Sequence, residues 1–368
     1  MRKNEIKNVE WKILIVAIIL SLIGLVALFS ATQENNYDEF YKQLIWLVVS
    51  LVAMVTIMFI SYEMLIKIAP ILYGSAIILL IAVLFTTPIN GASSWFDIGF
   101  FSFQPGEFAK IAVIIFIAYL INIIQQKNKN EINKPIKLLI VLVAFAIPVI
   151  LLMLQPDNGT AIAFIVSIGL MILISGINKK YIIAIVLLII LAVPIVYNFV
   201  LPEYAKQRIE IFFNPQSDPR GAGYNILQSK LAIGAGGLTG MGLLEGNQTQ
   251  LGFLHPKTTD FIFSVIGEEL GFIVGMSVIL LYIYLISKCM FVAKTSKDDT
   301  GMLIATGLTG IFIFHFVQNI GMVMGLLPIT GVPLPFISYG GSSLITNFVI
   351  IGIILNVSAK RQKTIFVK

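Results

Sequence analysis

Long apolar runs dominate this chain and restrict what it can fold into. They recur about ten times, and most are close to the roughly 18 to 24 residues that a helix needs to cross a bilayer, although the fifth and sixth are short. Only 12% of the residues are charged, against about 25% in a typical soluble domain. The sequence therefore predicts an all-α polytopic membrane protein of about ten transmembrane helices, folded as a single integral membrane domain over residues 1–368. The expected spans are Ile13–Ser30, Leu44–Ile60, Ile68–Phe85, Phe108–Ile124, Leu138–Leu154, Ala161–Ser175, Tyr181–Val200, Phe261–Ile286, Met302–Leu326 and Ser343–Val357.

The basic residues indicate on which side of the membrane each loop lies. An even number of spans puts both termini on one face, and most of the 25 Lys and Arg residues fall in the tails and short loops of that face. Cytoplasmic loops carry such an excess, so both termini of this multi-pass protein are expected on the cytoplasmic side of the cell membrane. The net charge of +6 then reflects topology, and no nucleic acid partner is expected.

Cysteine and histidine content narrows the chemistry. Cys289 is the single cysteine in the sequence, so an internal disulfide and a thiolate metal cluster are both excluded. His255 and His315 are too few for a zinc site of the usual kind.

The longest polar segment, Leu201–Asp260, falls between the seventh and eighth runs and is expected outside the cytoplasm, where it carries much of the active site. Asp260 ends this segment at the mouth of the next apolar run. A carboxylate at a membrane edge is costly unless it has a partner, and it usually marks function. Asp260 is therefore the leading catalytic candidate, and the alternative is that it only caps the helix that follows.

The same segment supplies cations and a glycine-rich run. Arg208, Arg220 and Lys230 are candidate substrate-binding residues, with an ordinary solvated surface as the alternative. The run from Gly234 to Gly242 is not followed by Gly-Lys-Ser/Thr, so it is not a P-loop. It favours either close backbone packing or backbone amides that point at an anion.

Charged residues inside the apolar runs need partners. Glu107 and Lys110 stand three residues apart at the start of the fourth span, where they can pair on one helix face. Such a pair must face the protein interior or a wet cavity. Both are candidate substrate-binding residues, and a structural ion pair without substrate contact is the alternative. Glu268 and Glu269 lie inside the eighth span, where one of them is expected to meet a polar partner across the bundle.

Three outer segments supply the remaining candidates. Trp95 precedes the fourth span and either binds substrate or belongs to an interfacial aromatic belt. Asp157 lies in the tight turn Gln155–Thr160 and either binds substrate or caps the next helix. Ser338 lies in the proline- and glycine-rich stretch Leu326–Ser343, which cannot form a regular helix. Irregular backbone at this depth is tolerated only where protein or a cavity covers it, so this stretch either binds substrate or is a re-entrant loop that only packs.

Taken together, these segments resemble the SEDS family (shape, elongation, division and sporulation), and the RodA type more than the FtsW type. The resemblance covers essentially the whole chain, and its last two blocks are highly specific. Gly246–Leu251 is the stretch that favours RodA, while Gly106, Asn158 and His255-Pro256 depart from the family pattern without removing a charged residue. The matching blocks are Gln104-Pro-Gly-Glu107, Gln155-Pro-Asp157-Asn-Gly-Thr160, Asp218-Pro-Arg-Gly-Ala-Gly-Tyr224 continuing to Gly234, Thr259-Asp260-Phe-Ile-Phe263 with Gly267-Glu-Glu-Leu-Gly271, and Asn319-Ile-Gly-Met with Gly331-Val-Pro-Leu-Pro-Phe-Ile-Ser-Tyr-Gly-Gly341.

The resemblance implies a peptidoglycan glycosyltransferase that serves cell elongation and shape. Such an enzyme polymerises lipid II, a lipid-linked disaccharide-peptide, into glycan strands on the outer face of the membrane and releases undecaprenyl pyrophosphate. The implied partner is a class B penicillin-binding protein, the transpeptidase that cross-links the strands. A divalent cation (Mg or Mn) on the pyrophosphate stays open, because no cluster of ligands in the sequence demands one.

The expected mechanism is a hexosyl transfer with inversion, in which Asp260 is the general base and contributes about 10²–10⁴-fold in rate. Cations stabilise the pyrophosphate as its charge grows; the candidates are Arg208, Arg220, Lys230 and Lys110. One alternative is a lipid II flippase, to which the intramembrane charges and broken helices would be suited. Another is a non-catalytic scaffold for the penicillin-binding protein. The polar candidates crowd one face and the chain shows no clear inverted repeat, which favours the enzyme.

Overall fold

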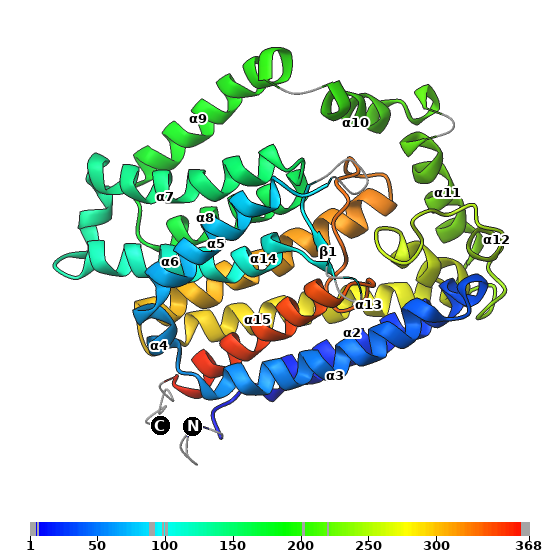
Figure 1. The fold of residues 1–368 in the computed structure, drawn as a ribbon, viewed down its shortest axis with the longest axis horizontal. Helices are drawn as coiled ribbons and strands as arrows, with labels where there is room; N and C mark the ends of the chain where they lie inside the picture. The colour runs from blue at the N-terminus through cyan, green and yellow to red at the C-terminus, as the bar shows by residue number, and fades with distance from the viewer. Residues whose placement is uncertain are drawn as a thin grey trace.

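The computed structural model describes residues 5, 7–87, 93–97, 99, 102–200, 203–218 and 221–361. Long helices lie side by side in a bundle (Figure 1), and each of the ten expected spans falls on a helix. These helices are α2 (Trp11–Ala31), α3 (Asp38–Phe59), α5 (Ala69–Val83), α6 (Pro105–Gln125), α7 (Pro135–Leu154), α8 (Asn158–Ile174), α9 (Lys179–Ile195), α13 (Ile262–Lys294), α14 (Asp299–Val323) and α15 (Gly341–Ala359).

The predicted fold class is confirmed. Seven of the described helices are long and apolar enough to span a membrane, namely α2, α3, α6, α7, α13, α14 and α15, while α5 and α8 are shorter apolar helices. The total of ten spans stays a prediction. Among the described residues, strands are limited to a two-stranded antiparallel ribbon of β1 (Phe96–Asp97) and β2 (Ser102–Phe103), in which Phe96 pairs with Phe103.

Local sequence explains where several helices begin. Pro105 and Pro135 start α6 and α7, since a proline at the first helical position gives up an N–H that has no intrahelical partner anyway. Asp157 and Asp298 cap α8 and α14, and their carboxylates accept from the backbone N–H groups of Thr160 and Gly301. A capping side chain of this kind stabilises a helix by about 1 kcal/mol.

The bundle has two distinct ends. At the first, the start of α2 meets the end of α15: the backbone N–H of Glu10 donates to Ser358 at 3.1 Å, and Glu10 pairs with Arg361 at 3.1 Å. We call this the terminal end. The opposite end, which we call the loop end, carries the β-ribbon and the segment of residues 324–340 between α14 and α15.

The polar segment expected as a loop is largely helical. After α9 and the π-helical turn η3 (Val196–Val200), it forms α10 (Glu203–Phe213), η4 (Pro215–Ser217), α11 (Ala222–Ala235) and α12 (Asn247–Gln250). In Figure 1, α9, α10 and α11 follow one another in an arc along one edge of the view. The remaining short helices are η1 (Gln33–Asn35), α4 (Tyr62–Lys67) and η2 (Lys129–Asn133).

The glycine-rich run fills a break in α13. Gly271 interrupts the helix with φ 75° and ψ −175°, a backbone conformation that glycine adopts without steric cost. The backbone N–H groups of Met241 and Gly242 donate to the carbonyls of Glu268 and Glu269, at 2.9 and 3.1 Å, and Phe272 donates to Gly237 at 2.9 Å. Of the two expected uses of the run, the structure shows close backbone packing, which satisfies groups that the broken helix leaves without partners.

Glu268 and Glu269 lie beside this break. The carboxylate of Glu268 accepts from the backbone N–H of Gln248 at 2.7 Å and from both the N–H and the hydroxyl of Thr249, so it caps α12. Glu269 accepts from the Ser30 hydroxyl of α2 at 2.7 Å, which is the polar partner expected across the bundle.

Candidate active site

A polar cavity of about 360 Å³ opens at the loop end. Its wall is contributed by the β-ribbon region, the first turns of α6 and α8, helix α10, the chain just before α13, helix α14 and the segment of residues 324–340. Residues that are far apart in the sequence therefore meet here. Five of the candidates named from the sequence line it: Trp95, Glu107, Asp157, Arg208 and Asp260.

The backbone around Asp260 is held on several sides. The side-chain amide of Asn319 donates to the carbonyl of Asp260 at 3.0 Å and to that of Val332 at 2.8 Å. The Ser338 hydroxyl donates to the carbonyl of Thr259 at 2.6 Å. Helix α13 begins at Ile262 with Phe261 as its N-cap residue, so Asp260 does not cap it, and Asp260 lines the cavity.

The surroundings of Asp260 make its carboxylate a stronger base than usual. Burial raises the pKa of Asp260 from 3.8 to about 6, while a hydrogen bond with Thr259 and the positive charge of Arg208 act in the opposite direction. Burial disfavours the charged form of an acid. A carboxylate with a pKa near 6 is mostly ionised at pH 7 and accepts a proton more readily than an exposed aspartate.

Glu107 and Lys110 form a buried ion pair at 2.8 Å, with the side chains 4% and 1% exposed. The pair faces the protein interior, as a charged pair inside a span must. Glu107 lines the cavity, and Lys110 lies behind it, with its Nζ 3.5 Å from Nε2 of His315. Among the described residues the second oxygen of Glu107, Oε2, has no hydrogen-bond partner.

Asp157 caps α8, which is one of the two roles that the sequence left open, and it also lines the cavity. Its Oδ1 accepts from the backbone N–H of Thr160 at 3.1 Å and so caps α8, while its Oδ2 accepts from the Gln104 amide at 2.9 Å. The second bond ties the start of α6 to the start of α8. Asp157 and Gln104 both line the cavity, so the cap is also part of its wall.

Arg208 brings a positive charge to the same cavity from α10. Its guanidinium is exposed and donates to the carbonyl of Ile329 at 3.4 Å. Trp95 is partly buried and contributes to the wall on the side of the β-ribbon. The cavity thus presents a carboxylate base, a cation and an aromatic surface to one enclosed volume.

Lys230 and Ser338 do not line the described cavity. Lys230 lies exposed on α11, where the end of its side chain covers Gly325, and it is not among the lining residues. Ser338 is also absent from the lining, because its hydroxyl is bonded to the Thr259 carbonyl and accepts from the N–H of Leu334 at 2.8 Å. Arg220 lies outside the described residues.

The structure adds lining residues that sequence reasoning did not single out: Gln104, Thr160, Thr259, His315 and Tyr339. His315 could have been found, because it stands one helical turn before Asn319 on α14 and therefore shares a face with it. The role of Tyr339 had no local signal, since its place depends on how the segment of residues 324–340 folds back toward Thr258.

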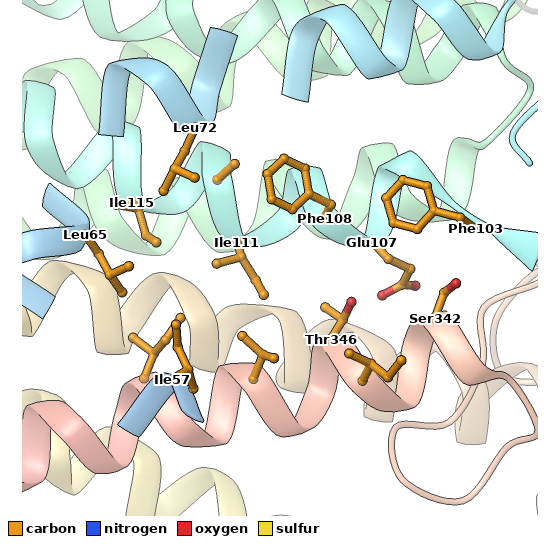
Figure 2. A pocket seen from close by; sticks show the side chains of 14 residues that line it. Ile57, Leu65, Leu72, Phe103, Glu107, Phe108, Ile111, Ile115, Ser342 and Thr346 are labelled. Carbon is orange, nitrogen blue, oxygen red and sulfur yellow. The ribbon is translucent and has the colours of Figure 1, made fainter. Parts of the chain in front are cut away.

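An apolar groove of about 390 Å³ adjoins the cavity along α3, α4, α5, α6 and α15. Most of its lining is aliphatic or aromatic, and Glu107, Ser342 and Thr346 are its polar members. In Figure 2 the carboxylate of Glu107 points from α6 toward Ser342 and Thr346 of α15. Glu107 therefore belongs to both the polar cavity and the apolar groove.

The described residues do not assemble a metal site. No group of three or more His, Cys, Asp or Glu side chains in this part of the chain could hold an ion.

Comparison with known proteins agrees with this architecture. The model of the cell cycle protein family of FtsW, RodA and SpoVE matches residues 10–363. The Escherichia coli K12 protein named peptidoglycan glycosyltransferase MrdB is 42% identical over 297 residues, which is 80% of this chain and 78% of that protein. A probable peptidoglycan glycosyltransferase FtsW of Trichlorobacter lovleyi is 37% identical over 359 residues, 94% of this chain and 92% of that one.

Two solved structures share the fold over nearly the whole chain. One, described as showing structural coordination of polymerization and crosslinking by a peptidoglycan synthase complex, has a TM-score of 0.84 at 28% identity, covering 96% of this chain and 99% of that chain. The other, the rod shape determining protein RodA of Thermus thermophilus, has a TM-score of 0.72 at 26% identity, covering 96% and 98%. The chain belongs to the FtsW/RodA/SpoVE family of cell cycle proteins, the SEDS family.

Proposed function

We propose that this protein is a peptidoglycan glycosyltransferase of the RodA type, which polymerises lipid II into glycan strands and uses Asp260 as the general base. The observation that carries the proposal is the Asp260 carboxylate, which has a raised pKa and shares one cavity with Arg208 and Glu107. The names of its relatives, peptidoglycan glycosyltransferases MrdB and FtsW, support the class of reaction.

In the proposed reaction Asp260 removes the proton from the 4-hydroxyl of the acceptor sugar as that oxygen attacks the anomeric carbon of the donor. A new C–O glycosidic bond forms, and the bond from the anomeric carbon to the pyrophosphate oxygen breaks. The electron pair of that bond leaves with undecaprenyl pyrophosphate, and the proton stays on Asp260 until water takes it. Direct displacement inverts the anomeric carbon, so one base is sufficient and no protein nucleophile is needed.

Arg208 is the described cation best placed to meet the leaving group. It lines the cavity, its guanidinium is exposed, and its charge already acts on Asp260. A donor aimed at charge that develops in the transition state is worth several kcal/mol in a site that excludes water. Lys110 acts on the cavity through Glu107, whereas Lys230, outside the described lining, is a weaker candidate.

The apolar groove supports the lipid part of the substrate. It runs beside the membrane-spanning part of α6 and α15 and meets the polar cavity at Glu107. A lipid-linked sugar needs this combination, because its isoprenoid tail is apolar and its pyrophosphate and sugars are polar. We assign the groove to the tail and the cavity to the head group.

Orientation and partnership are part of the same proposal. The described basic residues Lys7, Lys12, Lys360 and Arg361 lie at the terminal end. The positive-inside rule therefore favours that end in the cytoplasm and the cavity on the outer face. The similarity to a peptidoglycan synthase complex that coordinates polymerization and crosslinking supports a class B penicillin-binding protein as partner.

The test is glycan polymerisation by the purified protein with lipid II and its transpeptidase, comparing the wild type with Asp260→Asn. Asparagine keeps the size of the side chain and cannot act as a base at neutral pH. Asp97→Asn is the matched control, because Asp97 is an exposed carboxylate of the β-ribbon outside the cavity lining.

We expect the wild type and Asp97→Asn to make strands and Asp260→Asn to make none while it still folds. Equal polymerisation by wild type and Asp260→Asn would overturn the role of Asp260 and move the search for a base to Glu107 or Asp157. If none of the three proteins makes strands under conditions in which another glycosyltransferase works, the proposal that this protein is an enzyme is contradicted. A lipid II translocation assay in vesicles would then separate the flippase from the scaffold.

A further inference from the structure

A short chain of buried polar groups begins in the cavity wall, and the mechanism above gives its histidine no role. It runs from Glu107 to Lys110 on α6, then to His315 on α14, and ends at the carbonyl of Pro333. Glu107, Lys110 and His315 are each at most 3% exposed. Burying a polar or charged group costs free energy unless it has a hydrogen-bond partner. Each of these three groups therefore depends on the position of its neighbour.

The contact with Pro333 decides which nitrogen of His315 carries the proton. Nδ1 lies 3.0 Å from the Pro333 carbonyl, and a carbonyl oxygen can only accept. Nδ1 therefore donates, and in the neutral ring Nε2 carries the lone pair. Nε2 faces the ammonium of Lys110 at 3.5 Å. A protonated Nε2 would turn an N–H bond and a positive charge toward that ammonium, so the neutral ring is the form that fits.

This arrangement places Lys110 between two acceptors. Its ammonium donates to Oε1 of Glu107 at 2.8 Å and faces the lone pair of His315. Oε2 of the same carboxylate has no hydrogen-bond partner among the described residues. Since Glu107 lines both the polar cavity and the apolar groove, the unsatisfied oxygen stands where the head group and tail of a lipid-linked sugar would join.

We propose that His315 is a positioning residue for glycosyl transfer: its Nε2 holds the Lys110 ammonium on one oxygen of Glu107, which leaves the other oxygen to accept from a hydroxyl or amide N–H of the bound sugar. The inference rests on the proposed function. Without His315 the ammonium loses one of its two acceptors and is drawn across the carboxylate, where it competes with the substrate for Oε2.

The first test reads the contact without any activity. His255 and His315 are the two histidines of the sequence, so an exposed-site change, His255→Asn, leaves His315 as the single imidazole. Nitrogen-15 NMR of the labelled protein should show a protonated Nδ1 and an unprotonated Nε2. Lys110→Met should move the Nε2 resonance and leave Nδ1 nearly unchanged. The proposal would be overturned if Nε2 is protonated, or if the position of its resonance is unchanged by Lys110→Met.

The second test is a double-mutant cycle in the polymerisation assay. His315→Phe keeps an aromatic ring without nitrogens, and we expect kcat/KM to fall about tenfold or more, as for the loss of a hydrogen bond to a charged group. On a Lys110→Met background the same change should cost less than about threefold, because the two residues act through one contact. His315→Gln, which keeps one donor and one acceptor, should restore most of the loss.

Gln318→Leu is the matched control for the cycle. Gln318 lies on the same helix and donates to the carbonyl of Pro328 at 2.7 Å, so it ties α14 to the same segment without touching Lys110. The fold-change in kcat/KM that Gln318→Leu causes should be the same with and without Lys110→Met, so the two fold-changes multiply. If His315→Phe also multiplies with Lys110→Met, or leaves kcat/KM unchanged, His315 only tethers the segment and the proposal fails. If the wild type makes no glycan, the proposed function fails, and the NMR result alone decides whether His315 holds Lys110.

Discussion

Replacing Asp260 by asparagine should stabilise the protein while it removes activity. Burial raises the pKa of Asp260 from 3.8 to about 6, so its ionised form is less stable in the folded protein than in the unfolded chain. At about 1.36 kcal/mol per pH unit the difference corresponds to roughly 3 kcal/mol. The carboxylate is only partly enclosed, so solvent screening reduces the expected effect to about 1–2 kcal/mol.

The sign of the pH dependence follows from linkage. An acid whose pKa is raised by folding favours the folded state fully below pH 3.8, and this contribution is lost as the pH rises through 6. Asparagine is neutral throughout. The variant should therefore melt a few degrees above the wild type at pH 7.5, and the gap should close as the pH falls toward 4.

The assay is thermal unfolding in detergent at pH values between 4 and 8, with Asp97→Asn as the exposed control. For Asp97→Asn we expect the difference in melting temperature from the wild type to show no such pH dependence, because Asp97 is exposed. The claim is that the folded protein holds the ionised Asp260 carboxylate at a cost in stability. It would be refuted if Asp260→Asn melted below the wild type at pH 7.5, or if its increase in melting temperature did not change with pH.

Three further outcomes are expected. Polymerisation by the wild type should rise with pH and reach half its plateau near pH 6, where Asp260 ionises; a flat profile from pH 5 to 8 would contradict Asp260 as the base. Arg208→Gln removes the charge that opposes this shift, so a pH–rate profile should move its half-point to higher pH, and kcat should fall about tenfold or more. Glu107→Gln and Lys110→Met should each destabilise the folded protein by roughly 3–5 kcal/mol, since each leaves a buried charge unpaired. In thermal unfolding the double variant should lose less stability than the sum of the two single variants. Additive losses would argue against the ion pair.

The sequence was most informative where hydrophobic length and charge decide the structure. Apolar runs predicted helices at every position where the structure has a long one, because a bilayer requires about 20 apolar residues per helix. Glu107 and Lys110 were predicted to pair, because helical spacing of three residues and the cost of burial leave little choice.

Contacts between distant segments could not be predicted in the same way. The alternatives for Ser338 and the glycine run were open because a hydroxyl or a free amide near the membrane can serve a ligand or the backbone. The structure gives both to the backbone: Ser338 bonds Thr259, and the run completes the break at Gly271. The helical form of the polar segment was also missed, since α10 and α11 are shorter and more polar than a membrane-spanning helix.

The side-chain amide of Asn319 ties two segments of the cavity wall to helix α14. The amide donates to the carbonyl of Asp260 and to that of Val332, so two segments of the cavity wall are held to one side chain of α14. Because both carbonyls bond the same side chain, we expect a displacement of α14 to move the two segments together. Arg208 stands on α10, which packs on η4 and α11 and reaches this frame through one long bond to Ile329. In the proposed reaction the base is thus fixed to the interior helix α14, while the cation stands on a separate helix and can move with the departing pyrophosphate.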